Sequence, residues 1–189
     1  MTRRYRVGIE TRERILAATR RLLAEVGIEG VTLKAITNNA SVGAGSFYNL
    51  FDSKEEAVLE VVRQAIDAVD PDPEGEGTDT LADLVDAFAT FMIDSAPIAR
   101  IYLQLAVGGG MTDPSIAQRV LRSHRRRVDR FASAWQRHDP TLTDERARRR
   151  AEVMLSSLTG LGITALLDPA FDMRAHAQEL IPEASLTAG

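Results

Sequence analysis

The chain has 189 residues, an apolar fraction of 44% and a formal net charge of −4 at pH 7. It contains no cysteine, which excludes disulfides and thiolate metal sites and fits a reducing cytoplasm. The uncharged, mostly apolar run Val153–Leu167 has 15 residues and falls short of the ~20 that a membrane-spanning helix needs, so a soluble, cytoplasmic protein is expected.

Apolar residues recur at intervals of three and four along most of the chain, and no segment alternates as a strand does. The predicted fold class is therefore all-α, with about nine helices. Thr11 is expected to cap the first helix and Gly27 to end it, while Thr32 caps the second. In chain order, the expected helices cover about 12–27, 33–40, 45–51, 54–69, 81–95, 97–107, 114–138, 144–167 and 172–180.

Two features divide the chain. Ser53 can cap the fourth helix, and Glu56 three positions later completes a capping box. The stretch Asp70–Thr80 has two prolines, two glycines and only acidic charges, which predicts an exposed linker or mobile loop. We expect a helix-turn-helix head over residues 1–53 and a larger helical body over residues 54–189.

The short third helix has two distinct sides. Phe47, Leu50 and Phe51 stand three and four positions apart, so they form an inward apolar stripe. Ser46, Tyr48 and Asn49 point elsewhere. A second helix held out from a small bundle by a tight turn is the shape that enters the major groove of DNA.

The head resembles the TetR family of one-component bacterial regulators, over about residues 9–60. The resemblance depends on Gly30-Val31-Thr32 before the second helix, then Val42, Gly45, Ser46, Phe47, Tyr48, Phe51 and Ser53-Lys54-Glu55. The body matches the family only in the number and order of its helices. The sequence departs from the family at Ser41, where a turn glycine is usual, and at Thr37, where an alanine is usual.

The resemblance implies two sets of DNA contacts. The DNA backbone is contacted by Thr32, Tyr48, Asn49 and Lys54, and the base edges face Gly43, Ala44, Gly45 and Ser46. This reading face is small and nearly uncharged, with no arginine for bidentate guanine recognition. Specificity is expected to depend on thymine methyl groups, the Ser46 hydroxyl and DNA shape.

The charge distribution favours the same end of the chain. Residues 1–50 carry a net charge of +4, and residues 51–189 carry −8. Arg3, Arg4 and Arg6 could form a disordered basic arm that enters the minor groove, although a solvated helix start explains them equally well.

A regulator that binds twofold DNA holds two heads about one helical turn, ~34–36 Å, apart, so the body is expected to form a homodimer. The predicted interface helix is Asp144–Leu167, with a plain core helix as the alternative. The residues assigned to the dimer face are Met154, Leu155, Leu158, Gly160, Leu161, Gly162 and Leu166.

The resemblance also implies a ligand pocket in the body. Its candidate lining is Phe88, Phe91, Met92, Tyr102, Leu105, Met111, Val128, Phe131 and Trp135, although residues at such spacing often form a plain core. This lining favours a mostly apolar ligand. The run Arg125–Arg127 beside His124 is read as a solvated face, because successive helical residues diverge by ~100°.

The predicted function is therefore a DNA-binding transcriptional regulator, a repressor released from a palindromic operator by a small effector. A helical protein–protein adaptor is the alternative, and an all-helical enzyme is a weaker one. No catalytic residue, cofactor or metal site is predicted, because the three histidines stand apart and no cofactor motif is present.

Overall fold

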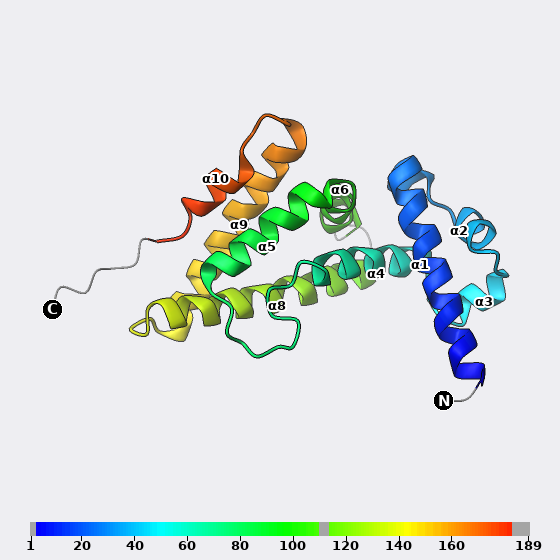
Figure 1. The fold of residues 1–189 in the computed structure, drawn as a ribbon, viewed down its shortest axis with the longest axis horizontal. Coiled ribbons are helices and arrows are strands. Elements are labelled where there is room, and N and C mark those ends of the chain that lie inside the picture. The colour runs from blue at the N-terminus through cyan, green and yellow to red at the C-terminus, as the bar shows by residue number, and fades with distance from the viewer. Residues whose placement is uncertain (1–2, 110–113, 183–189) are drawn as a thin grey trace.

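The computed structural model describes residues 3–109 and 114–182, and this part of the chain is all-α, as predicted (Figure 1). The elements are α1 (Arg3–Gly30), α2 (Leu33–Ala40), α3 (Ala44–Tyr48), α4 (Lys54–Asp67), α5 (Leu81–Asp94), α6 (Ala96–Gln104), the π-helical turn η1 (Leu105–Gly109), α8 (Pro114–His138), α9 (Asp144–Leu167) and α10 (Met173–Gln178). None of the described helices combines the length and apolarity needed to cross a membrane.

The first helix is longer than predicted. It begins at Arg3, and Thr11 lies inside it, where its hydroxyl donates to the carbonyl oxygen of Val7 at 2.7 Å. Thr11 is therefore not a cap, and the disordered arm predicted from Arg3 onward is wrong for the backbone, which is helical there. Gly27, with φ of 65°, interrupts the helix as expected, and one further turn follows it.

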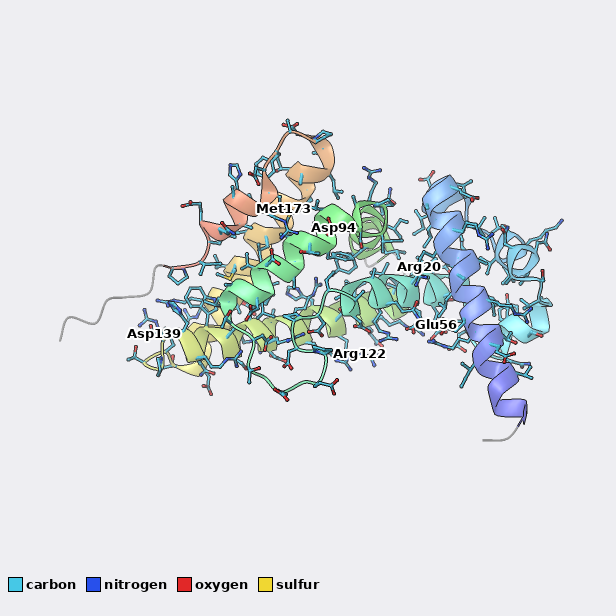
Figure 2. The ribbon with its side chains drawn as sticks, in the orientation of Figure 1. Arg20, Glu56, Asp94, Arg122, Asp139 and Met173 are labelled. Atoms are coloured by element: carbon cyan, nitrogen blue, oxygen red, sulfur yellow. The ribbon has the colours of Figure 1, made fainter. Side chains whose placement is uncertain are left out.

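The start of α4 is capped almost as predicted. Ser53 Oγ accepts the backbone N–H of Glu56 at 3.1 Å. The Glu56 carboxylate accepts the backbone N–H of Asp52 at 2.6 Å, one residue earlier than a standard capping box requires. The same carboxylate pairs with Arg119 of α8 at 3.0 Å, so the helix start is also held by the body. Figure 2 shows Glu56 where α4, α8 and the head meet.

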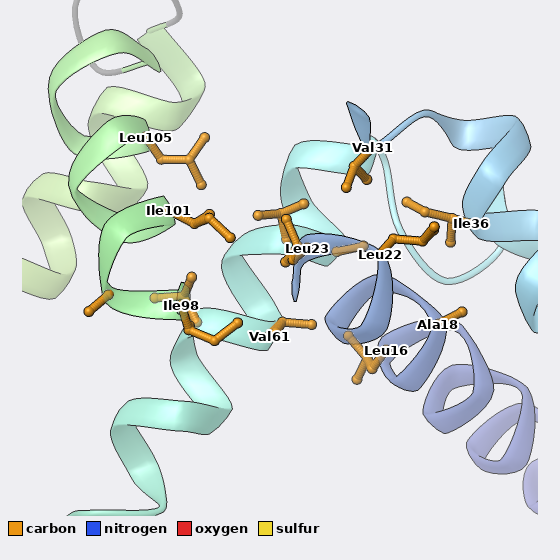
Figure 3. Close-up of a cluster of buried hydrophobic side chains, with 14 of the residues drawn as sticks. Leu16, Ala18, Leu22, Leu23, Val31, Ile36, Val61, Ile98, Ile101 and Leu105 are labelled. Atoms are coloured by element: carbon orange, nitrogen blue, oxygen red, sulfur yellow. The ribbon is translucent and has the colours of Figure 1, made fainter. Parts of the chain in front are cut away.

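One apolar core runs from the head into the body. Leu22 and Leu23 of α1, Val61 of α4, and Ile98 and Ile101 of α6 are all buried in the same cluster. Figure 3 shows the α6 side chains directed at α4 and at the end of α1. The head therefore packs on α6 as well as on α4, and its core is continuous across the predicted boundary between residues 53 and 54.

The rest of the body is a second cluster formed by α5, α8, α9 and α10, in which α8 and α9 pack against each other. In Figure 1 the two helices diverge from the turn that joins them. Phe131 of α8 and Leu155 and Leu158 of α9 are buried here. Thr80 and Asp83 form a complete capping box at the start of α5.

The acidic connection between α4 and α5 is exposed over most of its length, but it is not a free linker. Arg130 of α8 donates to both carboxylate oxygens of Asp70, at 3.0 and 2.6 Å, and to Asp79 at 2.7 Å. Asp79 is buried and also pairs with Arg137 at 3.5 Å. Two arginines of α8 therefore hold both ends of this loop.

Candidate nucleic-acid interface and effector cavity

The turn between α2 and α3 has the geometry that the sequence predicts. Thr32 Oγ1 accepts the backbone N–H of Ala35 at 3.1 Å and caps α2. Ser41 ends the helix in the left-handed region, with φ of 53°, and its N–H donates to Asn38 at 3.1 Å. A non-glycine residue in this conformation costs about 1 kcal/mol. This turn orients α3 away from α2.

Helix α3 is buried on one side and open on the other. Phe47 is fully buried and Phe51 nearly so, with their ring centroids 5.5 Å apart. Tyr48 is 56% exposed, and its ring meets Phe47 edge-on at 5.7 Å. The remaining predicted contact residues on this helix, Gly43, Ala44, Gly45, Ser46 and Asn49, are also exposed. The aromatic core thus holds a small outward surface, whose contact with DNA stays a prediction.

Lys54 has a structural contact that sequence reasoning missed. Its Nζ donates to the carbonyl oxygen of Val31 at 2.9 Å and lies 3.7 Å from the Glu55 carboxylate. The side chain is 36% exposed. It therefore ties the start of α4 to the α1–α2 connection, beside the exposed Thr32. The ammonium group has further N–H donors, so this contact leaves room for the predicted phosphate contact.

Basic residues of α1 bind α4. Arg12 pairs with Glu60 at 2.5 Å, and its guanidinium lies 5.5 Å from the centre of the Phe51 ring. Glu60 also accepts from Arg63 at 2.8 and 2.7 Å. Hydrogen bonds from Arg63 and from Arg12 lower the pKa of Glu60 to about 2. Arg20 donates to Gln64 of α4 at 2.7 Å, and Figure 2 shows it on the side of α1 that faces α4.

A cavity of about 80 Å³ lies in the body between the end of α4, α5 and α8. Phe88, Phe91 and Phe131, all predicted lining residues, form part of its wall. The lining that the sequence analysis missed comes from these three helices and from the start of the α4–α5 connection: Ile66, Val69, Asp70, Pro71, Leu84, Ala87, Arg127 and Arg130. The C-terminal end of α4 therefore forms one wall.

Other predicted lining residues are core. Met92 and Leu105 belong to the cluster shared with the head and Val128 to the second cluster, and none of the three lines this cavity, so these predictions are corrected. Trp135 lines a different pocket, beside Arg150 and Met154 of α9. Tyr102 does not line the cavity but accepts a hydrogen bond from Arg127, which does. Met111 lies outside the described residues.

The predicted dimer face mixes two sides of α9. Met154, Leu155 and Leu158 are at most 4% exposed, because they pack on α5 and α8 inside the chain. Gly162 is buried against Met92, whose Cε would lie 2.6 Å from an added Cβ. These four residues cannot form an outer face and are corrected. Gly160 is exposed, and Leu161 and Leu166 are half-buried.

The exposed side of α9 has its own row of apolar and small residues, called the outward seam below, which differs from the predicted dimer face. Its members recur at alternating intervals of three and four: Val153, Ser156, Gly160, Ile163 and Leu167. Val153 is 67% exposed, Ile163 44% and Leu167 80%. A heptad-like stripe of apolar and small residues facing solvent is typical of a helix that packs against another helix.

Residues 15–61 match the family described as bacterial regulatory proteins, tetR family. Over 52 residues the chain is 42% identical to an uncharacterized HTH-type transcriptional regulator of Lactococcus lactis subsp. lactis. This alignment covers 28% of this chain, and it spans only about a quarter, 26%, of that relative's length.

The whole fold is similar to those of several solved proteins. A transcriptional regulator from Rhodococcus sp. Rha1 has a TM-score of 0.67 at 22% identity, over 89% of this chain and 90% of that one. A putative regulator from Saccharomonospora viridis in complex with choline gives 0.65 at 21%, over 91% and 95%. SmeT, repressor of a multidrug efflux pump of Stenotrophomonas maltophilia, gives 0.64 at 19%, over 90% and 88%.

The head of this chain therefore matches the DNA-binding part of the TetR family. The matched residues 15–61 contain the buried stripe of α3, the caps at Thr32 and Ser53, and Lys54. The head accommodates the two departures from the family's usual pattern. Ser41 adopts the left-handed turn, and Thr37 is buried with its hydroxyl donating to the carbonyl of Leu33 at 3.0 Å.

Within residues 3–109 and 114–182, no three histidine or carboxylate side chains gather as metal ligands would. His176 stacks on Phe171 with ring centroids 4.4 Å apart, and His138 meets Trp135 edge-on at 6.0 Å. Both rings are therefore engaged in local packing.

Proposed function

We propose that this TetR-family protein is a homodimeric transcriptional repressor that acts in the cytoplasm, binds a palindromic operator and is released by a small effector in the body. The observation that carries the proposal is the position of α4. The first residue of α4, Lys54, is joined to the helix-turn-helix head by its hydrogen bond to the carbonyl oxygen of Val31. In the last turn of the same helix, Ile66 forms part of the wall of the body cavity.

The DNA-binding part of the proposal is supported by the exposed side of α3. Ala44, Gly45 and Ser46 are exposed, and a Cβ added at Gly45 would meet no atom within 4 Å. A base edge can therefore approach the helix backbone closely. Tyr48 and Asn49 at the end of the helix are exposed donors for phosphate oxygens.

The dimer is supported by the outward seam of α9. Val153, Ile163 and Leu167 are exposed apolar side chains, and Ser156 and Gly160 between them would let a second helix approach closely. Two copies related by a twofold axis would bury this seam and hold two heads for the two half-sites of a palindrome.

The size of the cavity supports release by an effector. Ligand pockets usually measure about 300–1,000 Å³, and this one measures about 80 Å³. A ligand of ordinary size must widen it, and the α4 wall is the one that continues directly into the head. An effector that binds the widened state better than the closed state shifts the population toward it.

The test begins with DNA selected from a random duplex pool by the purified protein, followed by affinity measurements on the selected duplex. Ala44→Lys places a cation on the proposed reading face. It should change the affinity for the selected duplex, or the ratio of affinities between two duplexes, by at least about tenfold. Ala170→Lys is the matched control, because it adds the same charge at an exposed position in the connection between α9 and α10, far from α3 (Figure 1).

Two results would reject the DNA-binding proposal. One is a selected pool without any shared sequence, with affinity that depends on salt alone. The other is an Ala44→Lys variant whose affinity and sequence preference equal those of the Ala170→Lys control.

A further inference from the structure

Arg127 of α8 lines the body cavity in an unusual state. Its Nε is fully buried and has no hydrogen-bond acceptor. Its Nη2 donates to the hydroxyl of Tyr102, and its guanidinium lies 5.1 Å from the centre of that ring. The residue as a whole is half-buried, but a buried N–H of a charged group normally has a hydrogen-bond acceptor. Within the part of the chain that the structure describes, the Nε–H of Arg127 has none, and its guanidinium pairs with no carboxylate.

The carboxylates near the cavity are already engaged. Both oxygens of Asp70 accept from Arg130, and this pairing lowers the pKa of Asp70. Asp79 is buried between Arg130 and Arg137. The positive charge of Arg127 is therefore left without a carboxylate, in a cavity whose other walls are mostly apolar.

The positive charge of Arg127 also affects the pKa of a neighbouring histidine. His124 lies one turn before Arg127 on α8, and its pKa is lowered first by burial and then by the positive charge of Arg127. Arg148 of α9 acts in the same direction, and Glu152 of α9 opposes both. The neighbourhood of Arg127 therefore favours a negative charge over a further positive one.

We propose that the effector of this cavity is a small monocarboxylate with an apolar body. The inference rests on the proposed function, because it names the ligand class of the same cavity. The carboxylate would accept from the guanidinium of Arg127, which lines the cavity, while Tyr102 would hold that guanidinium in position through their hydrogen bond. The apolar body would pack on Phe88, Phe91 and Phe131.

The charge and size of the cavity also disfavour other classes of ligand. A quaternary ammonium compound would bring a second positive charge next to Arg127, so choline-like cations are disfavoured. A long acyl chain exceeds the available space unless α4 moves. Short or aromatic carboxylates of about eight to eleven heavy atoms need the least widening of the cavity and are therefore favoured.

Binding to the full chain without DNA tests the inference directly. The probes are four acid–amide pairs of the same shape: benzoate, phenylacetate, 3-phenylpropionate and hexanoate, each with its neutral amide. Calorimetry and thermal shift should show at least one acid that binds about tenfold or more tightly than its amide. Arg127→Gln should remove that preference, whereas Arg126→Gln, on the exposed side of the same helix, should keep it.

A second variant guards against a folding artefact. Tyr102→Phe keeps the ring beside Arg127 and removes only the hydroxyl, so the acid should bind a few-fold more weakly while the helical content and melting temperature stay close to the parent values. The inference is overturned when no acid exceeds its amide, or when the preference for an acid survives Arg127→Gln.

The outcome separates this inference from the proposed function. Neutral amides that release operator DNA as well as the acids do would retain effector release and reject the carboxylate. An acid that binds through Arg127 but leaves the operator complex intact would retain the carboxylate site and reject effector release.

Discussion

The joint between α1 and α4 depends on one carboxylate, Glu60, and the structure predicts how much it contributes. Glu60 is 14% exposed and accepts from Arg12 of α1 and from Arg63 of its own helix. Hydrogen bonds from Arg63, the larger cause, and from Arg12 lower the pKa of Glu60 from 4.5 to about 2. Glu60→Gln keeps the shape of the side chain and removes the charge.

The magnitude follows from this pKa. One pKa unit corresponds to 1.36 kcal/mol, so the full shift would amount to roughly 3 kcal/mol of stability at neutral pH. Arg63 is 56% exposed, and solvent screening reduces the contribution of an exposed partner. We expect Glu60→Gln to lower the free energy of unfolding by about 1–2 kcal/mol at pH 7.

The lowered pKa of Glu60 also fixes the direction in which stability changes with pH. The pKa of Glu60 is lower in the folded chain than in the unfolded one, so its stabilising effect is complete well above pH 4.5 and is lost as the pH falls toward 2. Urea unfolding of the parent and of Glu60→Gln should therefore differ most at neutral pH and converge toward pH 3. Glu29→Gln, at an exposed position, is the control and should show no such convergence. A gap between parent and Glu60→Gln that is equally large at pH 7 and pH 3 would refute the reasoning.

Helix α9 supplies the remaining predictions. Ile163→Glu places a charge in the outward seam of α9 and should give a monomer by sedimentation. The control Val26→Glu changes a residue of the head that is 51% exposed, and this variant should stay dimeric. A dimeric Ile163→Glu variant would exclude the seam as the dimer interface. In that monomeric form, Gly162→Ala should be about 1–3 kcal/mol less stable to urea than Gly160→Ala, because its Cβ would meet the buried Met92 while that of Gly160 meets open space. Equal stability of the two alanine variants would mean that the packing of Met92 relaxes without cost.

Local signals in the sequence were sufficient for the head. The caps at Thr32 and Ser53 and the stripe of Phe47 and Phe51 depend on neighbours within a few residues, and these elements agree with the structure. The start of α1 was wrong because Thr11 fits a cap and a helix interior equally well. Nothing in the sequence alone shows that the helix continues back to Arg3.

The body was harder because its errors concern which helices meet. Helix α9 is apolar on two sides, and only the docking of α5 and α8 decides that Met154 and Leu158 face inward. The run Arg125–Arg127 was read as a solvated face. Two of its members are exposed, but Arg127 lies against the cavity because Tyr102, 25 residues away in the chain, packs beside it.

The shared core limits how an effector could act. Leu23 of α1, Val61 of α4 and Ile101 of α6 are buried in one cluster. A rotation of the head relative to α4 and α6 would therefore expose apolar surface to water. A displacement of α4 would instead carry α1 with it and break the weaker polar contact to α8, where Arg119 and Glu56 are 37% and 28% exposed. A partly exposed pair of this kind contributes about 0–1 kcal/mol, whereas allosteric coupling between two sites usually amounts to 1–3 kcal/mol. The energy available from a bound effector is therefore enough to break this contact, and the apolar cluster would move as one body with the head.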